Sequence, residues 1–155
     1  MESPLSSLNK VEILIIASPG GHSVVAHELF DDCKWSYDFI TSSNTLTLLN
    51  PMERRNNQLA IIESNRDFVF FYQLILAFKI LIKSNPKIIV SSGAGLAIPF
   101  FIWGFFFRTK LIFIESASRV TSLSLTGKLL IILANRFYVR SPKLKDKYPN
   151  VLYFS

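Results

Sequence analysis

Apolar residues along the chain fall into short continuous runs that are separated by polar or glycine-containing turns. Runs rich in Ile, Val and Phe predict strands at residues 11–17, 37–41, 59–63, 87–90, 111–114, 136–140 and 151–154. The runs are continuously apolar rather than alternating, which is typical of parallel strands whose two faces are both covered.

Longer apolar segments between these runs have helical spacing. They predict helices at residues 22–32, 68–83, 96–107 and 122–134, whereas residues 42–58 are polar and predict a long loop. Strand and helix alternate, so we expect an α/β fold with a doubly wound, mostly parallel, Rossmann-like sheet. No repeat or linker divides the chain, and residues 1–155 are therefore expected to form a single domain.

The candidate functional residues lie where predicted strands end. In an open α/β sheet, ligands bind outside the carboxyl ends of the strands. Glycines between a strand and a helix let the backbone approach a ligand, and the start of a helix favours phosphate. These positions predict a phosphate or diphosphate site, where Gly20-Gly21 and Gly93-Ala94-Gly95 expose the backbone and Ser92, Ser116 and Arg119 can add hydrogen-bond donors.

Each of these residues has a structural alternative. Glycines at these turns can serve tight turns or close strand–helix packing instead of phosphate contact. His22 either starts a helix or acts on a substrate, and Glu115 is either a buried partner of Arg119 or a catalytic group. No dinucleotide fingerprint, Walker A sequence or zinc-ligand spacing is present, so we expect no metal and no cofactor.

The composition adds two features, a basic C-terminal third and an excess of apolar side chains. The net charge is 17 − 11 = +6, and residues 108–155 account for the whole excess, with nine basic against two acidic side chains. Half of the residues are hydrophobic and there is one cysteine, which excludes a disordered chain and a disulfide scaffold. The basic residues are not interleaved with aromatic ones, so we expect no nucleic-acid partner.

Fourteen Phe are more than a small core needs, so part of the apolar surface is expected to contact a membrane or a partner. Residues 68–72 and 100–107 are apolar on all sides, which is typical of either a buried or a membrane-facing helix. The apolar stretches that contain them, 68–82 and 96–107, are too short to span a bilayer, which takes about 20 residues. The candidate membrane or partner surface is Phe100, Phe101, Trp103, Phe105, Phe106, Phe107 and the basic Arg108.

Several motifs in order resemble a known family. They are Gly20-Gly21-His22, Ser91-Ser92-Gly93-Ala94-Gly95 with Pro99, Ile114-Glu115-Ser116 with Arg119-Val120, Ser124-Leu125-Thr126-Gly127-Lys128, and Tyr148-Pro149. Together they resemble the membrane-anchoring subunit family of the split UDP-N-acetylglucosaminyltransferase that makes dolichol-linked chitobiose. The resemblance is greater to the bacterial branch of that family, which serves capsule and exopolysaccharide assembly.

The resemblance implies the N-terminal half of a GT-B glycosyltransferase. A small partner subunit would bind the UDP-sugar, and this chain, inactive alone, would bind a polyprenyl-diphosphate-linked saccharide. The resemblance implies an acceptor and diphosphate site lined by Gly20, Gly21, His22, Ser92, Gly93, Ala94, Gly95, Glu115, Ser116 and Arg119. The pair would work at the cytoplasmic face of the cell membrane with inversion at the anomeric carbon, and His22 is the one candidate base. Many eukaryotic members carry an N-terminal membrane anchor that is not evident here, so peripheral attachment through another surface is expected. A non-catalytic membrane-docking scaffold and a self-sufficient phosphosugar-binding enzyme are the alternatives.

Overall fold

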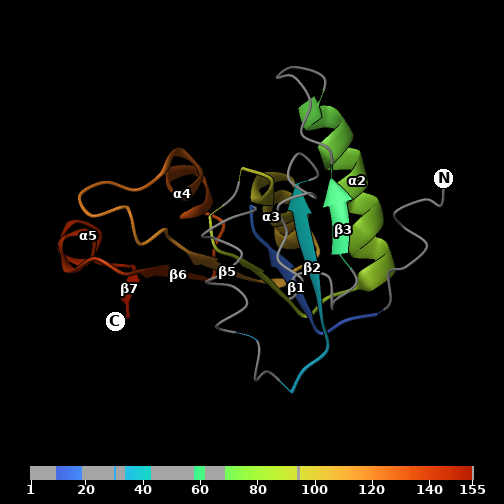
Figure 1. Ribbon diagram of the computed structural model, residues 1–155, viewed down its shortest axis with the longest axis horizontal. Coiled ribbons are helices and arrows are strands. Elements are labelled where there is room, and N and C mark those ends of the chain that lie inside the picture. The colour runs from blue at the N-terminus through green and yellow to red at the C-terminus, as the bar shows by residue number, and fades with distance from the viewer. Residues whose placement is uncertain are drawn as a thin grey trace.

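A computed structural model of the chain describes residues 10–18, 30, 34–42, 58–61, 69–93 and 95–154. Its strands are β1 (Ile13–Ile16), β2 (Tyr37–Ser42), β3 (Gln58–Ile61), β4 (Ile88–Ser91), β5 (Lys110–Ile114), β6 (Arg136–Val139) and β7 (Leu152–Tyr153). They form one seven-stranded sheet in the order β3-β2-β1-β4-β5-β6-β7, and every neighbouring pair is parallel (Figure 1). The predicted parallel, Rossmann-like sheet is confirmed.

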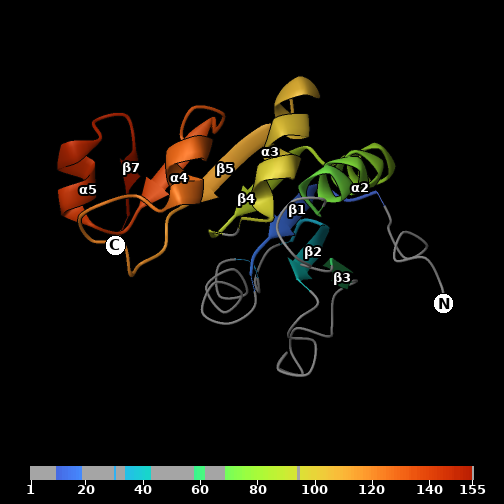
Figure 2. The same cartoon turned by 90° about the horizontal axis from the view of Figure 1, so that it is seen from above.

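The described helices are α2 (Val69–Ser84), α3 (Ala97–Phe106), α4 (Leu125–Leu130) and α5 (Pro142–Lys147). All of them lie on the same side of the sheet (Figure 2). Helix α4 is shorter than the predicted segment 122–134. It begins at Leu125 because Ser124 caps it, its side chain accepting a hydrogen bond from the backbone N–H of Gly127. The predicted helix 22–32 lies outside the described residues except for Phe30.

Helix α5 was not predicted from the sequence, although residues typical of a helix start are present. Ser141 stands at the N-cap position and Pro142 follows at the first helical position, where its missing N–H has no intrahelical role. The helix is short and mostly charged, and Leu144 is its one buried residue. A segment this short, with one buried residue, has too few apolar positions for a helical period to be seen in the sequence.

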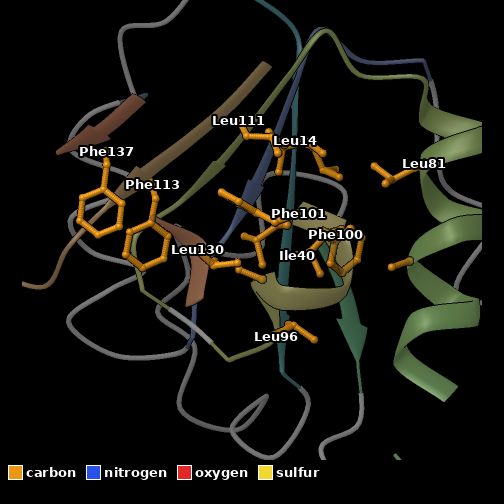
Figure 3. Close-up of a cluster of buried hydrophobic side chains, with 14 of the residues drawn as sticks. Leu14, Ile40, Leu81, Leu96, Phe100, Phe101, Leu111, Phe113, Leu130 and Phe137 are labelled. Carbon is orange, nitrogen blue, oxygen red and sulfur yellow. The ribbon is translucent and has the colours of Figure 1, made fainter. Parts of the chain in front are cut away.

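A hydrophobic core fills the space between the sheet and the helix layer (Figure 3). Phe100 and Phe101 of α3 lie in it and are fully buried, which corrects their assignment to the membrane or partner surface. The cause is the close approach of α3 to the sheet at Gly104. A Cβ at Gly104 would lie 2.7 Å from Leu111 Cδ2 and 2.8 Å from Ile89 Cδ1.

Candidate functional site

The loops after β4 and β5 lie at the same carboxyl-terminal edge of the sheet, because the two strands are parallel neighbours. Strand β4 lies between β1 and β5, and the strand order reverses between β1 and β4. The Ser92 N–H donates to the Ile16 carbonyl across this reversal, at 3.4 Å. A reversal of this kind is where open α/β sheets bind their ligands. The predicted site residues Gly20, Gly21, His22 and Ala94 lie outside the described residues, so their roles stay predictions.

The loop after β4 has a conformation that needs glycine. Gly93 has a φ of 100°, which residues with a side chain rarely adopt, and its N–H donates to Ser91 Oγ at 3.4 Å. A Cβ at Gly95 would meet nothing within 4 Å, so close packing does not explain this glycine. The loop therefore presents backbone with little side-chain cover at the edge of the sheet.

The loop after β5 is organised around the buried carboxylate of Glu115, which is 1% exposed. Its Oε1 accepts a hydrogen bond from the Ser116 N–H at 3.0 Å. Its Oε2 accepts from the Ser124 N–H at 2.9 Å and from the Ser124 hydroxyl at 3.0 Å. A Cβ on Gly127 would overlap Oε2, so glycine at this point of α4 leaves the space that the carboxylate occupies.

Glu115 thus has the structural role that was one of its two interpretations, but with another partner. Its hydrogen bonds go to Ser116 and Ser124, which stand at the two ends of the loop, rather than to Arg119. The carboxylate fixes the loop and, through Ser124, the start of α4. The involvement of Ser124 was not anticipated, although its place before an apolar helical run is typical of a capping serine.

The tip of this loop holds Arg119 at the surface. The Arg119 N–H donates to the Ser116 carbonyl at 3.0 Å, and the Ser141 hydroxyl donates to the Val120 carbonyl at 2.8 Å. The Ser116 and Ser118 hydroxyl oxygens lie 2.9 Å apart. The backbone is fixed on both sides of Arg119 while the residue itself is exposed. An exposed guanidinium and serine hydroxyls on one loop are groups suited to phosphate oxygens.

An apolar surface, which we call the α2–α3 patch, extends over the outer sides of α2 and α3. It consists of Phe71, Ile75, Ile82, Phe105, Phe106 and Phe107, all of them exposed. The half-buried Phe78 connects the two helices, with ring centroids 4.8 Å from Trp103 and 5.8 Å from Phe107. The Trp103 Nε1 donates to the Leu74 carbonyl at 2.9 Å, which ties α3 to α2.

Exposed cations lie on α2 or follow α3, the two helices that carry the α2–α3 patch. Lys79 and Lys83 lie on α2, and Arg108 and Lys110 follow α3. Part of the predicted membrane or partner surface lies in this region, namely Trp103, Phe105, Phe106, Phe107 and Arg108. The sequence predicted α2 as an apolar segment but did not indicate which of its side chains are exposed here. The spacing of Phe71, Ile75 and Ile82 puts them on one side of the helix. Within the described part of the chain, no helix combines the length and apolar character needed to cross a bilayer.

Comparison with known proteins identifies relatives of this chain. The model of a protein family described as "Oligosaccharide biosynthesis protein Alg14 like" matches residues 41–155. UDP-N-acetylglucosamine transferase subunit ALG14 of Mus musculus is 30% identical over 92 residues, which are 56% of this chain and 42% of the relative. The subunit of the same name from Yarrowia lipolytica is 34% identical over 84 residues, 50% of this chain and 39% of the relative. The chain therefore spans about two fifths of the length of these curated relatives.

Solved structures share the fold at low sequence identity. MurG of Acinetobacter baumannii superposes with a TM-score of 0.70 at 9% identity, over 85% of this chain and 42% of that chain. The UDP-GlcNAc 2-epimerase from Methanocaldococcus jannaschii gives a TM-score of 0.67 at 14% identity, over 86% of this chain and 40% of that chain. At these identities the likeness establishes the Rossmann-like fold alone.

Proposed function

This chain belongs to the Alg14-like family of oligosaccharide biosynthesis proteins, and from that membership we propose that it is the acceptor-binding, membrane-recruiting subunit of a two-component glycosyltransferase. A separate nucleotide-sugar-binding subunit binds the UDP-sugar. The sugar passes to a saccharide linked to a polyprenyl diphosphate, in the biosynthesis of a bacterial surface polysaccharide such as a capsule or exopolysaccharide. The complex works at the cytoplasmic face of the cell membrane, to which this chain is peripherally attached.

The observation that carries the proposal is the fixed loop after β5 beside the glycine loop after β4. Glu115 holds this loop so that Arg119 is exposed at its tip. A lipid diphosphate is a concentrated negative charge, and Arg119 and the Ser116 hydroxyl supply a cation and a donor for it. In this proposal Gly93 leaves the neighbouring backbone open to the same diphosphate.

The chemistry expected of the complex is an inverting transfer. A hydroxyl of the acceptor saccharide loses its proton as it attacks the anomeric carbon, the bond to the UDP oxygen breaks, and UDP leaves as the anion. His22 is the candidate base for this proton. The described residues of this chain hold the acceptor in place, which converts the encounter with the sugar donor into a positioned reaction.

Recruitment to the membrane is assigned to the α2–α3 patch. Contiguous exposed apolar side chains on a monomer are typical of a protein or membrane contact. Exposed Lys79, Lys83, Arg108 and Lys110 add the positive charge that favours an anionic lipid surface. The combination supports a bilayer more than a second soluble protein.

The proposal is tested with the complex of this chain and its partner subunit, a UDP-sugar and a lipid-linked acceptor. Arg119→Ala is expected to raise the KM for the acceptor roughly ten- to a hundredfold, the range of a lost charged hydrogen bond. Lys143→Ala, an exposed cation on α5, is the matched control and is expected to leave this KM unchanged. Transfer by this chain without its partner, or an unaltered KM in Arg119→Ala, would contradict the proposal.

A non-catalytic membrane-docking scaffold is the second candidate. The observation in its favour is that the described hydrogen bonds of Glu115 are all internal, so that this carboxylate is used in folding. A scaffold predicts full turnover in Arg119→Ala when the acceptor is supplied in detergent, together with lost vesicle binding in Ile75→Gln. If the chain is instead the acceptor-binding subunit, Arg119→Ala should impair turnover in the detergent assay.

A further inference from the structure

The outer side of α4 and the turn after it carry the two most exposed large apolar side chains of the described residues, Ile132 and Leu125, together with the exposed Leu129. Ile132 is 83% exposed, Leu125 80% and Leu129 58%. The hydrogen bonds from Ile131 N–H to Gly127 O and from Ala134 N–H to Leu130 O, both 2.9 Å, continue the helical path beyond Leu130. The three side chains therefore follow one side of the helix at intervals of four and three residues. We call them the α4 stripe.

The fold does not need the α4 stripe. Helix α4 packs against the core through its opposite side, where Leu130 is fully buried and Gly127 is buried against Glu115. Single exposed leucines are common, but a row of three on a short helix leaves apolar area in contact with water. A row of this kind on one helix face is typical of a contact surface.

The charge of the helix layer indicates what covers the α4 stripe. Helices α2, α3, α4 and α5 lie on one side of the sheet (Figure 2) and together contain six lysines and one acidic residue, Asp146. Lys128 is exposed on α4 itself. An apolar row within a cationic layer is complementary to a bilayer that contains anionic lipid.

We propose that the α4 stripe inserts into the same anionic bilayer as the α2–α3 patch, as a second membrane contact. This inference rests on the membrane recruitment that is part of the proposed function. A single contact leaves the domain free to tilt about it, whereas two contacts on one layer fix its orientation. Leu125 follows Ser124, which is hydrogen-bonded to Glu115, so the second contact is mechanically joined to the loop that carries Arg119. The acceptor loop is thereby brought close to the head groups, where a lipid diphosphate lies.

The test measures membrane depth at single labelled positions in the complex with the partner subunit. Cys33, the one cysteine, is replaced by serine, and an environment-sensitive fluorophore is attached to Ile132→Cys, Phe106→Cys or Arg140→Cys. The vesicles contain phosphatidylglycerol and acyl-chain-brominated phosphatidylcholine. Arg140 is the matched control because its guanidinium lies over the ring of Phe154, which packs on the other face of the sheet, at 5.6 Å from the ring centroid.

We expect bromine quenching at positions 132 and 106 and none at position 140. We also expect Leu129→Gln with Ile132→Gln to weaken vesicle binding about a hundredfold, which is about tenfold for each aliphatic side chain that no longer inserts. Trp35→Gln, an exposed apolar residue outside the helix layer, is the control for this measurement and should bind as the parent does.

Quenching at 106 without quenching at 132 would overturn the α4 inference and leave the proposed membrane recruitment standing. Absence of quenching at both positions in an active complex would overturn both. A change in the fluorescence at position 132 when the partner subunit is added without vesicles would show that the α4 stripe binds protein, and this too would overturn the inference.

Discussion

The described chain buries two carboxylates, one in each half of the sheet, and their surroundings differ sharply. Glu115, at the end of β5, is 1% exposed and both of its oxygens accept hydrogen bonds. Asp38, within β2, is 3% exposed, and its Oδ2 accepts no hydrogen bond from the residues that the structure describes. Thr41 Oγ1 on the same strand is likewise buried without a described partner.

The difference indicates that the carboxylate of Glu115 stabilises the fold, whereas the charged carboxylate of Asp38 destabilises it. The negative charge of Glu115 is matched by three donors, two of them backbone N–H groups that would otherwise be unsatisfied in the loop. Burial without such donors disfavours the charged form of Asp38 and raises its pKa above the ordinary value. Removal of the two charges should therefore change stability in opposite directions.

The largest effect is expected from Glu115→Gln. An amide has one oxygen, so its NH2 group must face either the Ser116 N–H or the Ser124 N–H, and one backbone donor loses its acceptor. We expect the free energy of unfolding to fall by about 3 kcal/mol, as for a buried donor left unsatisfied next to a lost charge. Denaturation in urea, followed by tryptophan fluorescence, measures the change.

Glu12→Gln is the matched control for this substitution. Glu12 forms an ion pair with Lys87 at 3.0 Å on the surface, and such pairs contribute less than about 1 kcal/mol. If Glu115→Gln were no more destabilising than Glu12→Gln, Glu115 would not be the residue that holds the loop.

The hydrogen-bond partner of Glu115 is an example of a contact that the sequence does not predict. Arg119 is four residues away and is the natural partner by spacing, whereas Ser124 is reached only because the loop folds back to the start of α4. The strands were predicted closely because continuous apolar runs such as 111–114 depend on local composition. In an all-apolar helix such as α3 no polar residue distinguishes the two sides, so the burial of Phe101 and the exposure of Phe106 follow from the tertiary packing alone.

An intermediate effect is expected from Ser124→Ala, which removes one donor from Glu115 and the cap of α4. The Ser124 hydroxyl donates to Glu115 Oε2 and accepts from the Gly127 N–H at 2.9 Å, so both bonds are lost while the Ser124 N–H remains. We expect a loss of about 1–2 kcal/mol and faster tryptic cleavage after Arg119. Ser124→Thr keeps the hydroxyl and should cleave at the parental rate. Equal cleavage of the alanine and threonine variants would mean that the loop does not depend on this side chain.

The smallest effect, and the one of opposite sign, is expected from Asp38→Asn. Because the pKa of Asp38 is raised in the folded state, the folded protein binds the proton more tightly than the unfolded chain does. Stability is therefore lost as the pH rises from the ordinary aspartate value through the raised pKa, and it is constant above that. A neutral amide removes this penalty, so Asp38→Asn should be more stable than the parent by about 1 kcal/mol at neutral pH, with a difference that disappears in acid. Urea denaturation at several pH values measures this, with the exposed Asp146→Asn as control. A difference that stays constant with pH would show that the two carboxylates do not differ in the way their surroundings indicate.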